Sequence, residues 1–419
     1  NRLFIVWNGW SGYRSRIFIG WGACFPETLH HFCVYPTNYR YSAGFWFHHL
    51  FNALSMSVSL VSVLPEFRLD AGAQAQSPPN SSLLPLLQAH VNAKTKPLGS
   101  LGRVEELGIQ LGLIQGVCCP VLTHPAVVVF AADHGIAAVE PVSAYPQSVT
   151  AQMVLNFLAG GAAMNVFANT YGLETWVVDV GVAQELPVGA PRFLSRKAGQ
   201  GTAPLNQTAA MTPGQLRQAL EAGVEAVEIL HDRGTNVWVA GEMGIGNTTA
   251  SAAILCKLAG LPIEVAVGKG TGVDEVGLAR KRTVVEQALR LHAEAVEPLE
   301  VLRCLGGFEL AALVGSYLRA ADRQMLLLVD GFIASVAWLV AYRLNPGLKH
   351  YTVFSHQSAE SGHKALLQNV GMRPLLNLDL RLGEATGALL AWPLIQAAVA
   401  FMSEMATFEQ AAVDTQLLA

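Results

Sequence analysis

A glycine-rich string in the middle of the sequence offers a place where a small anion could bind. The string GEMGIGNTT spans residues 241–249, after the apolar run VWVA and before the helical pattern ASAAILCKLAG. Gly244 and Gly246 let the backbone approach a ligand, and a helix N-terminus with free N–H groups follows. The lysine of a P-loop is missing, so a monophosphate fits better than a triphosphate. The alternative is a glycine turn that binds nothing, and Glu242 at the strand end weighs against it.

A second string, LDLRLGEATGALLAWPL, places one carboxylate, Glu384, in front of an apolar helical pattern. Burial there would raise its pKa and make it a competent acceptor for a proton from a weakly acidic N–H. The alternative is an acid in the first turn of a helix, where it complements the helix dipole. Arg381, three residues earlier, is either an ion-pair partner or a phosphate ligand.

Other candidate residues suggest an aromatic ligand more strongly than a metal. Tyr145, Met153 and Phe157 could line a flat apolar slot, although core packing is the default interpretation of such a pattern. The pairs Asp133–His134 and His356–His363 do not have the spacing of a known ligand motif, and there is no GxSxG elbow. We therefore predict no metal site and interpret these histidines as structural hydrogen-bonding residues.

Five apolar runs, each ending in a polar or glycine-bearing step, predict buried parallel strands separated by helices. Helical patterns occur near 147–169, 213–232, 248–260, 275–296, 308–321, 332–344 and 359–369. The predicted fold is α/β, with a doubly wound, mostly parallel open sheet of Rossmann-like type. Ligands bind beyond the carboxyl ends of such strands. The strand-end residues are Asp133, His134, Asp179, Glu242, Asp330, Ser355 and His356.

The two ends of the chain differ from this α/β core, which we place at 126–383. Helical patterns in 83–125 and 384–410 have no strand of their own, so we expect a small helical subdomain formed from both ends. Residues 56–82 are interpreted as a lead-in or linker. Residues 1–55 hold half of the eight Trp residues and precede the first methionine, Met56. We interpret them as a non-native or unstructured upstream extension; a targeting or anchor segment is the alternative.

Composition narrows the class of protein further. Of the 419 residues, 52% are hydrophobic and 14% charged, which excludes disorder. The formal net charge of −4 and the lack of a long basic run argue against nucleic-acid binding. The uncharged runs contain residues that suit a core helix better than a membrane span, so no membrane association is predicted. The six cysteines show no CxxC pair, which indicates a reducing cytoplasm.

Nine strings, in the same order along the chain, resemble the nicotinate-nucleotide:dimethylbenzimidazole phosphoribosyltransferase family. The resemblance covers about residues 83–410. The strings are KPLGSLGRVEELGIQL (96–111), FAADHGIAA (130–138), VSAYPQSVTAQMVLNFLAGGAA (142–163), GEMGIGNTTASAA (241–253), GKGTGVDEVGLARKR (268–282), LGGFEL (305–310), LVDGFIAS (328–335), SHQSAESGH (355–363) and LRLGEATGALLA (380–391).

The resemblance implies a cytoplasmic, homodimeric enzyme without metal or organic cofactor. Its substrates would be nicotinate mononucleotide and 5,6-dimethylbenzimidazole, and its products α-ribazole 5′-phosphate and nicotinate. Glu384 would be the general base, and Glu242 would stabilise the positive charge at C1′ of the ribose. The phosphate and ribose would contact Gly244, Ile245, Gly246, Asn247, Thr248, Lys281, Arg381 and Gly383, and the aromatic base would contact Tyr145, Met153, Met243 and Leu382.

Two other functions fit the residues less well. A catalytically silent protein that binds a cobamide base or its riboside would have no need of Glu384. A metal-dependent hydrolase using Asp133 and His134 would lose activity on chelation.

Overall fold

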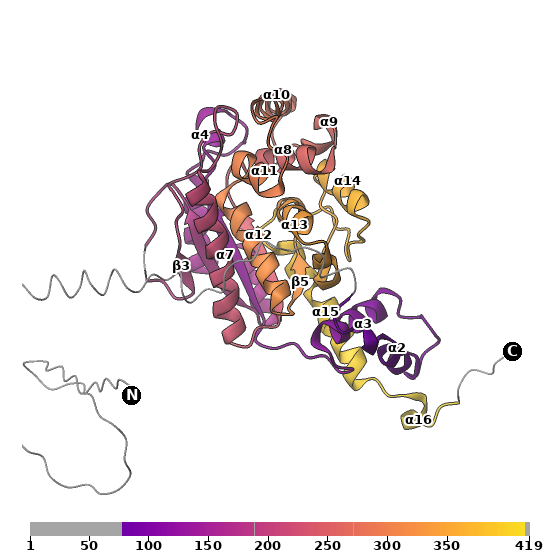
Figure 1. Ribbon diagram of the computed structural model, residues 1–419. Helices are drawn as coiled ribbons and strands as arrows, with labels where there is room; N and C mark the ends of the chain where they lie inside the picture. Colours follow the sequence, from indigo (N-terminus) through magenta and orange to yellow (C-terminus); the bar gives the residue numbers. More distant parts are fainter. Residues whose placement is uncertain (1–77, 188, 271, 415–419) are drawn as a thin grey trace, which may run out of the picture. The chain divides into compact units, whose positions relative to one another are not determined.

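A computed structural model describes residues 78–187, 189–270 and 272–414. The predicted extension 1–55 and nearly all of the predicted lead-in lie outside these residues. The described chain contains one six-stranded sheet in the order β3-β2-β1-β4-β5-β6, and every neighbouring pair is parallel (Figure 1). The strands are β1 (Ala126–Ala132), β2 (Glu174–Gly181), β3 (Phe193–Ser195), β4 (Val237–Met243), β5 (Leu326–Val329) and β6 (Thr352–Phe354).

The open parallel sheet confirms the predicted α/β fold, and five of its strands are the five predicted apolar runs. The edge strand β3 was missed because three residues, none of them buried, give no apolar signal. From β1 the chain winds outward to β2 and β3, then crosses back to β4 on the other side of β1. The strand order therefore reverses between β1 and β4, where this architecture opens a crevice for a ligand.

Helices cover both faces of the sheet. Their bounds are α2 (Leu84–Asn92), α3 (Arg103–Gln115), α4 (Ile136–Val139), α5 (Val149–Ala159), α6 (Ala163–Tyr171), α7 (Pro213–Asp232), α8 (Asn247–Ala259), α9 (Ile263–Ala266), α10 (Glu275–Leu291), α11 (Pro298–Leu305), α12 (Phe308–Asp322), α13 (Phe332–Leu344), α14 (Ser361–Val370), α15 (Thr386–Glu404) and α16 (Phe408–Ala411), with short 3₁₀ turns η2 (Ser81–Leu83) and η3 (Pro346–Tyr351).

Strand β1 shows how the two faces are built. Its residues 126, 128, 130 and 132 belong to a core that includes α7, α12 and α13. Its residues 127, 129 and 131 belong to a second core with α3, α5, α6 and α15. All seven residues are buried, so the strand is an uninterrupted apolar run because both faces are covered.

Two helical predictions match the structure without change, at 213–232 and 332–344. The predicted helix at 147–169 is wrong as one element. Helix α5 ends at Ala159, before Gly160, whose φ of 79° is left-handed, and α6 starts anew at Ala163. Helix α11 was missed; Pro298 occupies its first turn, where proline is compatible with a helix.

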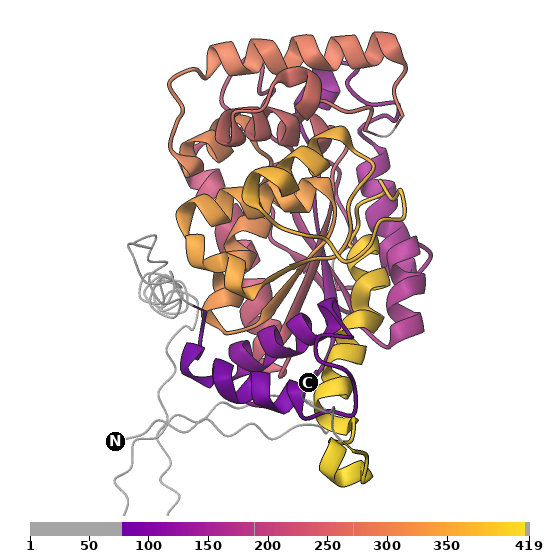
Figure 2. The same ribbon diagram turned by 90° about the vertical axis from the view of Figure 1, so that its right-hand side faces the viewer.

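The helices from the two chain ends pack on each other. Leu87 and Val91 of α2 share a small core with Phe401 and Met402 of α15. Lys96, whose ammonium group lies 5.9 Å from the centre of the Phe401 ring, pairs with Glu105 at 2.8 Å. The first half of α15 instead packs in the second core beside the sheet, next to α6 (Figure 2). We propose that residues 83–125 and 384–410 form a small helical subdomain built from both ends of the chain.

Within the described residues, two helical stretches are long and apolar enough to pass a test for a membrane span, 149–171 and 386–404. The first is two helices with a glycine break. The second packs against α3, α6 and β4, and over half of it is buried. This packing is typical of core helices.

Candidate active site

A cavity of about 340 Å³ opens where β4, β5 and β6 end. Its position at the carboxyl edge, beside the reversal of strand order, is the one the fold predicts for a ligand. It collects residues from six separate segments of the chain. The predicted site residues that line it are Tyr145, Met153, Glu242, Met243, Gly244, Ile245, Asn247, Thr248, Arg381, Leu382, Gly383 and Glu384.

Two predicted site residues lie behind the cavity wall. Gly246 begins helix α8 with a φ of 102°, and its α-carbon faces Ala137 and His134. Lys281 is 1% exposed and donates hydrogen bonds to Thr248 Oγ1 at 3.0 Å and to the Gly268 carbonyl at 3.1 Å. Burial lowers the pKa of Lys281 to about 8. Lys281 therefore reaches the cavity through Thr248.

Eight further residues line the cavity. Of these eight, only His356 was among the strand-end residues that the sequence predicted at the carboxyl edge of the sheet. The others lie within the strings that carry the family resemblance, but none of them was assigned a role in the site. These lining residues are Val149, Gly270, Gly331, Phe332, Ile333, His356, Ser358 and Glu360.

Glu384 lies in a strained turn between the last loop and α15. Its φ is 60° and that of Ala385 is 61°, so two consecutive non-glycine residues are left-handed. Each costs about 1 kcal/mol or more, which the surrounding structure must offset. Ala385 is the N-cap residue of α15 and Glu384 precedes it. The interpretation of Glu384 as a first-turn acid is therefore wrong, because the residue lies outside the helix.

Burial and charge both act on the Glu384 carboxyl group. The residue is 4% exposed. Burial, with a smaller contribution from the Asp330 carboxylate, raises the pKa of Glu384 to about 7. A carboxyl group in this range is available as a base near neutral pH.

The same pKa predicts how Glu384 affects stability. Because its folded-state pKa is raised, wild-type protein loses stability as pH rises from about 4.5 to about 7. The difference of about 2.5 in pKa corresponds to about 3 kcal/mol. We expect Glu384→Gln to be more stable than wild type at pH 8 by up to this amount, and nearly equal at pH 4.5. Urea unfolding at both pH values measures the difference; an equal gain at both would contradict it.

Glu242, at the end of β4, is a second buried carboxyl group of the cavity. It is 4% exposed and accepts a hydrogen bond from Asn247 Nδ2. Burial raises its pKa well above the usual range, and the carboxylates of Glu309, Asp330 and Glu384 add to the effect. The site therefore brings together carboxyl groups that are held largely in the neutral form. A cationic centre in the cavity would favour the ionised form of Glu242 and be stabilised by it.

The turn at 244–248 connects β4 to α8 and is held in place by hydrogen bonds. The N–H of Ile245 donates to Thr150 Oγ1 at 3.1 Å, and that of Asn247 donates to the Gly244 carbonyl at 3.1 Å. Gly244 has no room for a Cβ, which would lie 2.5 Å from the Ala132 carbonyl oxygen. The structure thus has the strand, glycine turn and helix N-terminus that the sequence predicted.

One wall of the cavity is apolar and reaches the surface. Val149 and Met153 of α5 lie with Met243 on this wall. Tyr145 and Leu382 are 53% and 56% exposed at its edge. A flat apolar ring could enter between these side chains. Phe157 does not line the cavity; it is a buried core residue, as the alternative interpretation expected.

The hydrolytic alternative is not supported by the positions of Asp133 and His134. His134 Nε2 pairs with Glu309 Oε1 at 2.6 Å, and Asp133 Oδ2 accepts from the Ala183 N–H at 2.8 Å. Both residues are buried, and neither lines the cavity. His363 is also structural: its Nδ1 accepts from the Ser358 N–H at 2.8 Å, and burial lowers its pKa to about 3.

Among the described residues, one group of three potential metal ligands lies within reach of a single ion: Glu228, His231 and Asp232. It lies at the end of α7, which leads into the amino end of β4, opposite the cavity. Glu228 is already paired with Arg319 and Arg323. This group has no part in the site.

The fold and the cavity together define an α/β protein with buried carboxyl groups in a cavity at the carboxyl edge of a parallel sheet. A family described as Phosphoribosyltransferase matches residues 77–413. The chain belongs to this family. It is 54% identical over 339 residues to a nicotinate-nucleotide–dimethylbenzimidazole phosphoribosyltransferase of Cupriavidus necator, covering 81% of this chain and 97% of that one.

Other relatives agree. An enzyme of the same name from Shewanella piezotolerans is 46% identical over 338 residues, covering 80% of this chain and 98% of the relative. The crystal structure of CobT from Thermus thermophilus superposes with a TM-score of 0.77 at 47% identity, and covers 80% of this chain and all of that chain. The predicted family resemblance is confirmed.

Proposed function

We propose that this protein transfers the 5-phosphoribosyl group of nicotinate mononucleotide to 5,6-dimethylbenzimidazole. The products are α-ribazole 5′-phosphate and nicotinate, as expected of nucleotide-loop assembly in cobalamin biosynthesis. The relatives' names support the substrates. The observation that carries the chemistry is Glu384, a carboxyl group with a pKa of about 7 beside an apolar wall.

The reaction exchanges one bond at C1′ of the ribose for another. A ring nitrogen of the base forms the new bond as the bond to the nicotinate nitrogen breaks, and the electron pair returns to that nitrogen. Attack from the opposite face inverts the anomeric carbon from β to α. The other ring nitrogen of the base becomes acidic and gives its proton to Glu384.

The remaining residues of the cavity hold the substrates. Glu242 would stabilise the oxocarbenium-like C1′ in its ionised form, which a developing cation beside it favours. The hydrogen bond from Asn247 orients the Glu242 carboxyl group. We assign the 5′-phosphate to the 244–248 turn, with Arg381 and Lys281 contributing positive charge, and the ribose to the neighbouring Gly383 loop. The base occupies the slot formed by Tyr145, Met153, Met243 and Leu382.

The proposal includes three further features. The residues of the cavity supply all the groups that this reaction needs, so we propose that it proceeds without a metal or an organic cofactor. We place the protein in the cytoplasm, because its cysteines form no CxxC pair and the family resemblance implies that location. We also propose a homodimer, as the family resemblance implies.

The test is release of nicotinate from nicotinate mononucleotide by the full chain, with and without 5,6-dimethylbenzimidazole. Base-dependent release, with α-ribazole phosphate formed in equal amount, is the expected result. Saturable binding of the base without any release would show a silent binding protein instead. Activity lost on chelation would indicate the hydrolytic alternative.

A further inference from the structure

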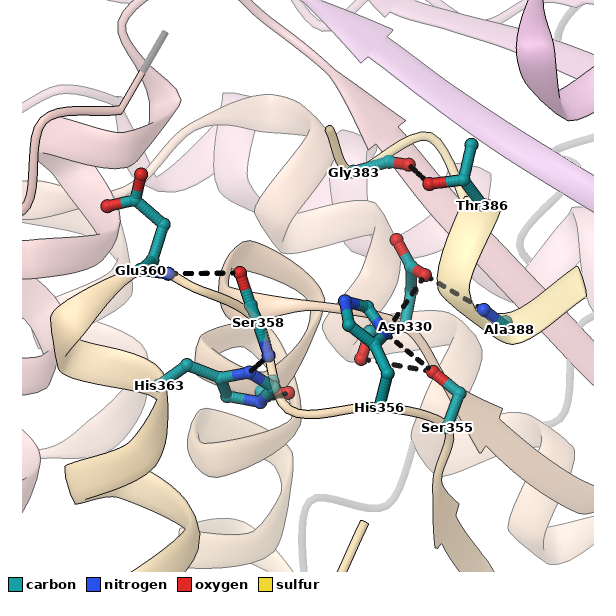
Figure 3. Close-up of polar contacts among 10 residues, drawn as sticks. Asp330, Ser355, His356, Ser358, Glu360, His363, Gly383, Thr386 and Ala388 are labelled. Atoms are coloured by element: carbon teal, nitrogen blue, oxygen red, sulfur yellow. Dashed lines mark hydrogen bonds and ion pairs between the residues drawn. The ribbon is translucent and has the colours of Figure 1, made fainter. Parts of the chain in front are cut away.

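Asp330 contacts the helix that follows the Glu384 turn and is connected to the turn through a hydrogen bond to the start of α15. It follows β5 and is 1% exposed. Its Oδ1 accepts a hydrogen bond from the N–H of Ala388 at 3.0 Å (Figure 3). Ala388 is in the first turn of α15, which begins two residues after Glu384. Asp330 thus ties the start of this helix to the end of β5.

A histidine fills the space between the same elements. His356 follows β6, and its Nδ1 lies 3.1 Å from Ser355 Oγ and 3.9 Å from Asp330 Oδ1. A Cβ on Gly387, in the first turn of α15, would lie 1.9 Å from this nitrogen. Gly331 also contacts the ring, because a Cβ at this position would lie 3.3 Å from His356 Cε1. Glycine at 387 is therefore required for the helix to sit against His356.

These contacts matter because the Glu384 turn does not hold its own conformation. Glu384 and Ala385 are both left-handed, and such a pair relaxes unless the flanking residues are fixed. On the loop side, the Gly383 carbonyl accepts from the N–H and the hydroxyl of Thr386, at 3.0 Å and 2.7 Å. On the helix side, the fixing group is Asp330.

Asp330 also contributes charge. The charged and titratable groups around Glu384 come from every neighbouring element: Glu242 from β4, Asp330 from β5, His356 from β6 and Arg381 from its own loop, with Glu309 of α12 behind Glu242. Asp330 is the acid that raises the pKa of Glu384 in addition to burial.

We propose that Asp330 is a positioning residue for the transfer reaction: its carboxylate fixes the Glu384 turn through Ala388, and its negative charge acts on the Glu384 carboxyl group. The inference rests on the proposed function. Asp330 does not line the cavity, so it acts through Glu384 and has no contact with substrate.

The variant Asp330→Asn separates charge from shape, because an amide oxygen can still accept from the Ala388 N–H. We expect kcat to fall about tenfold and the acid limb of kcat/KM to move down by about one pH unit, since Glu384 loses a like-charged neighbour. Base affinity should change less than twofold. Asp330→Glu keeps the charge but displaces the oxygen, so we expect its acid limb at the wild-type position and a lower kcat.

Asp179→Asn is the matched control. Asp179 is equally buried at the end of β2, where it accepts from the Gly181 and Val182 N–H groups, and it does not line the cavity. The acid limb of kcat/KM in the Asp179→Asn variant should stay at the wild-type position. A wild-type kcat and acid limb in Asp330→Asn would overturn the inference. If that variant does not fold, a wild-type kcat in Asp330→Glu would do the same. Wild-type protein that releases no nicotinate would instead refute the proposed function.

Discussion

Glu384→Gln is expected to lower kcat by about 10²- to 10⁴-fold while leaving the affinity for 5,6-dimethylbenzimidazole within twofold of wild type. The range is that of a general base removed from the transition state. The amide has nearly the shape of the carboxyl group, so the apolar slot is unchanged, but it cannot accept the proton that the base loses. The rate of nicotinate release at saturating substrate measures kcat, and calorimetric titration with the base measures the affinity.

The pH dependence of wild-type protein tests the same role. Only the ionised form of Glu384 accepts a proton, so kcat/KM should fall as the pH drops below about 7, in line with the pKa of this group. Glu105→Gln serves as a control for altering a buried glutamate, since Glu105 pairs with Lys96 among the terminal helices. It should lower stability and leave kcat near wild type. A Glu384→Gln variant with more than a tenth of wild-type kcat would assign the proton to another group.

The sequence predicted the sheet and most of the site because these depend on local patterns. Buried parallel strands give uninterrupted apolar runs, as β1 does. A polar residue that ends such a run must lie at the carboxyl edge, which places Glu242 without knowledge of any contact. The glycine turn at 244–248 has its own local signal in glycine spacing and capping residues.

Other features depend on contacts between distant segments and leave no local signal. The left-handed conformation of Glu384 is one, because a Gly-Glu-Ala sequence is typical of an ordinary helix start. The link from Asp330 to Ala388 joins residues 58 positions apart. The pKa of Glu384 arises from burial that only the packed structure provides. Sequence patterns therefore locate the two carboxyl groups that we propose as catalytic, whereas the groups that hold them in place and shift their pKa values become visible only in three dimensions.

Gly241→Ala is expected to lower kcat by about 100-fold or more, although Gly241 has no functional group. It lies inside β4, paired with Val129 of β1. A Cβ at this position would lie 2.2 Å from the Ala385 nitrogen and 2.6 Å from the Glu384 carbonyl carbon. Both are backbone atoms of the Glu384 turn, so the whole turn must shift. A displacement of about 1 Å is enough to cost about 10²-fold in rate.

Measuring both stability and activity distinguishes a displaced Glu384 turn from a general loss of folded protein. In a strand, alanine is ordinarily favoured over glycine by about 0.5–1 kcal/mol, whereas overpacking costs about 1–3 kcal/mol. We therefore expect a lower melting temperature along with the lower kcat. Gly214→Ala is the control, since a Cβ there meets no atom within 4 Å. A Gly241→Ala variant with kcat within threefold of wild type would mean that the Glu384 turn tolerates displacement, and that its contact with β4 does not position the base.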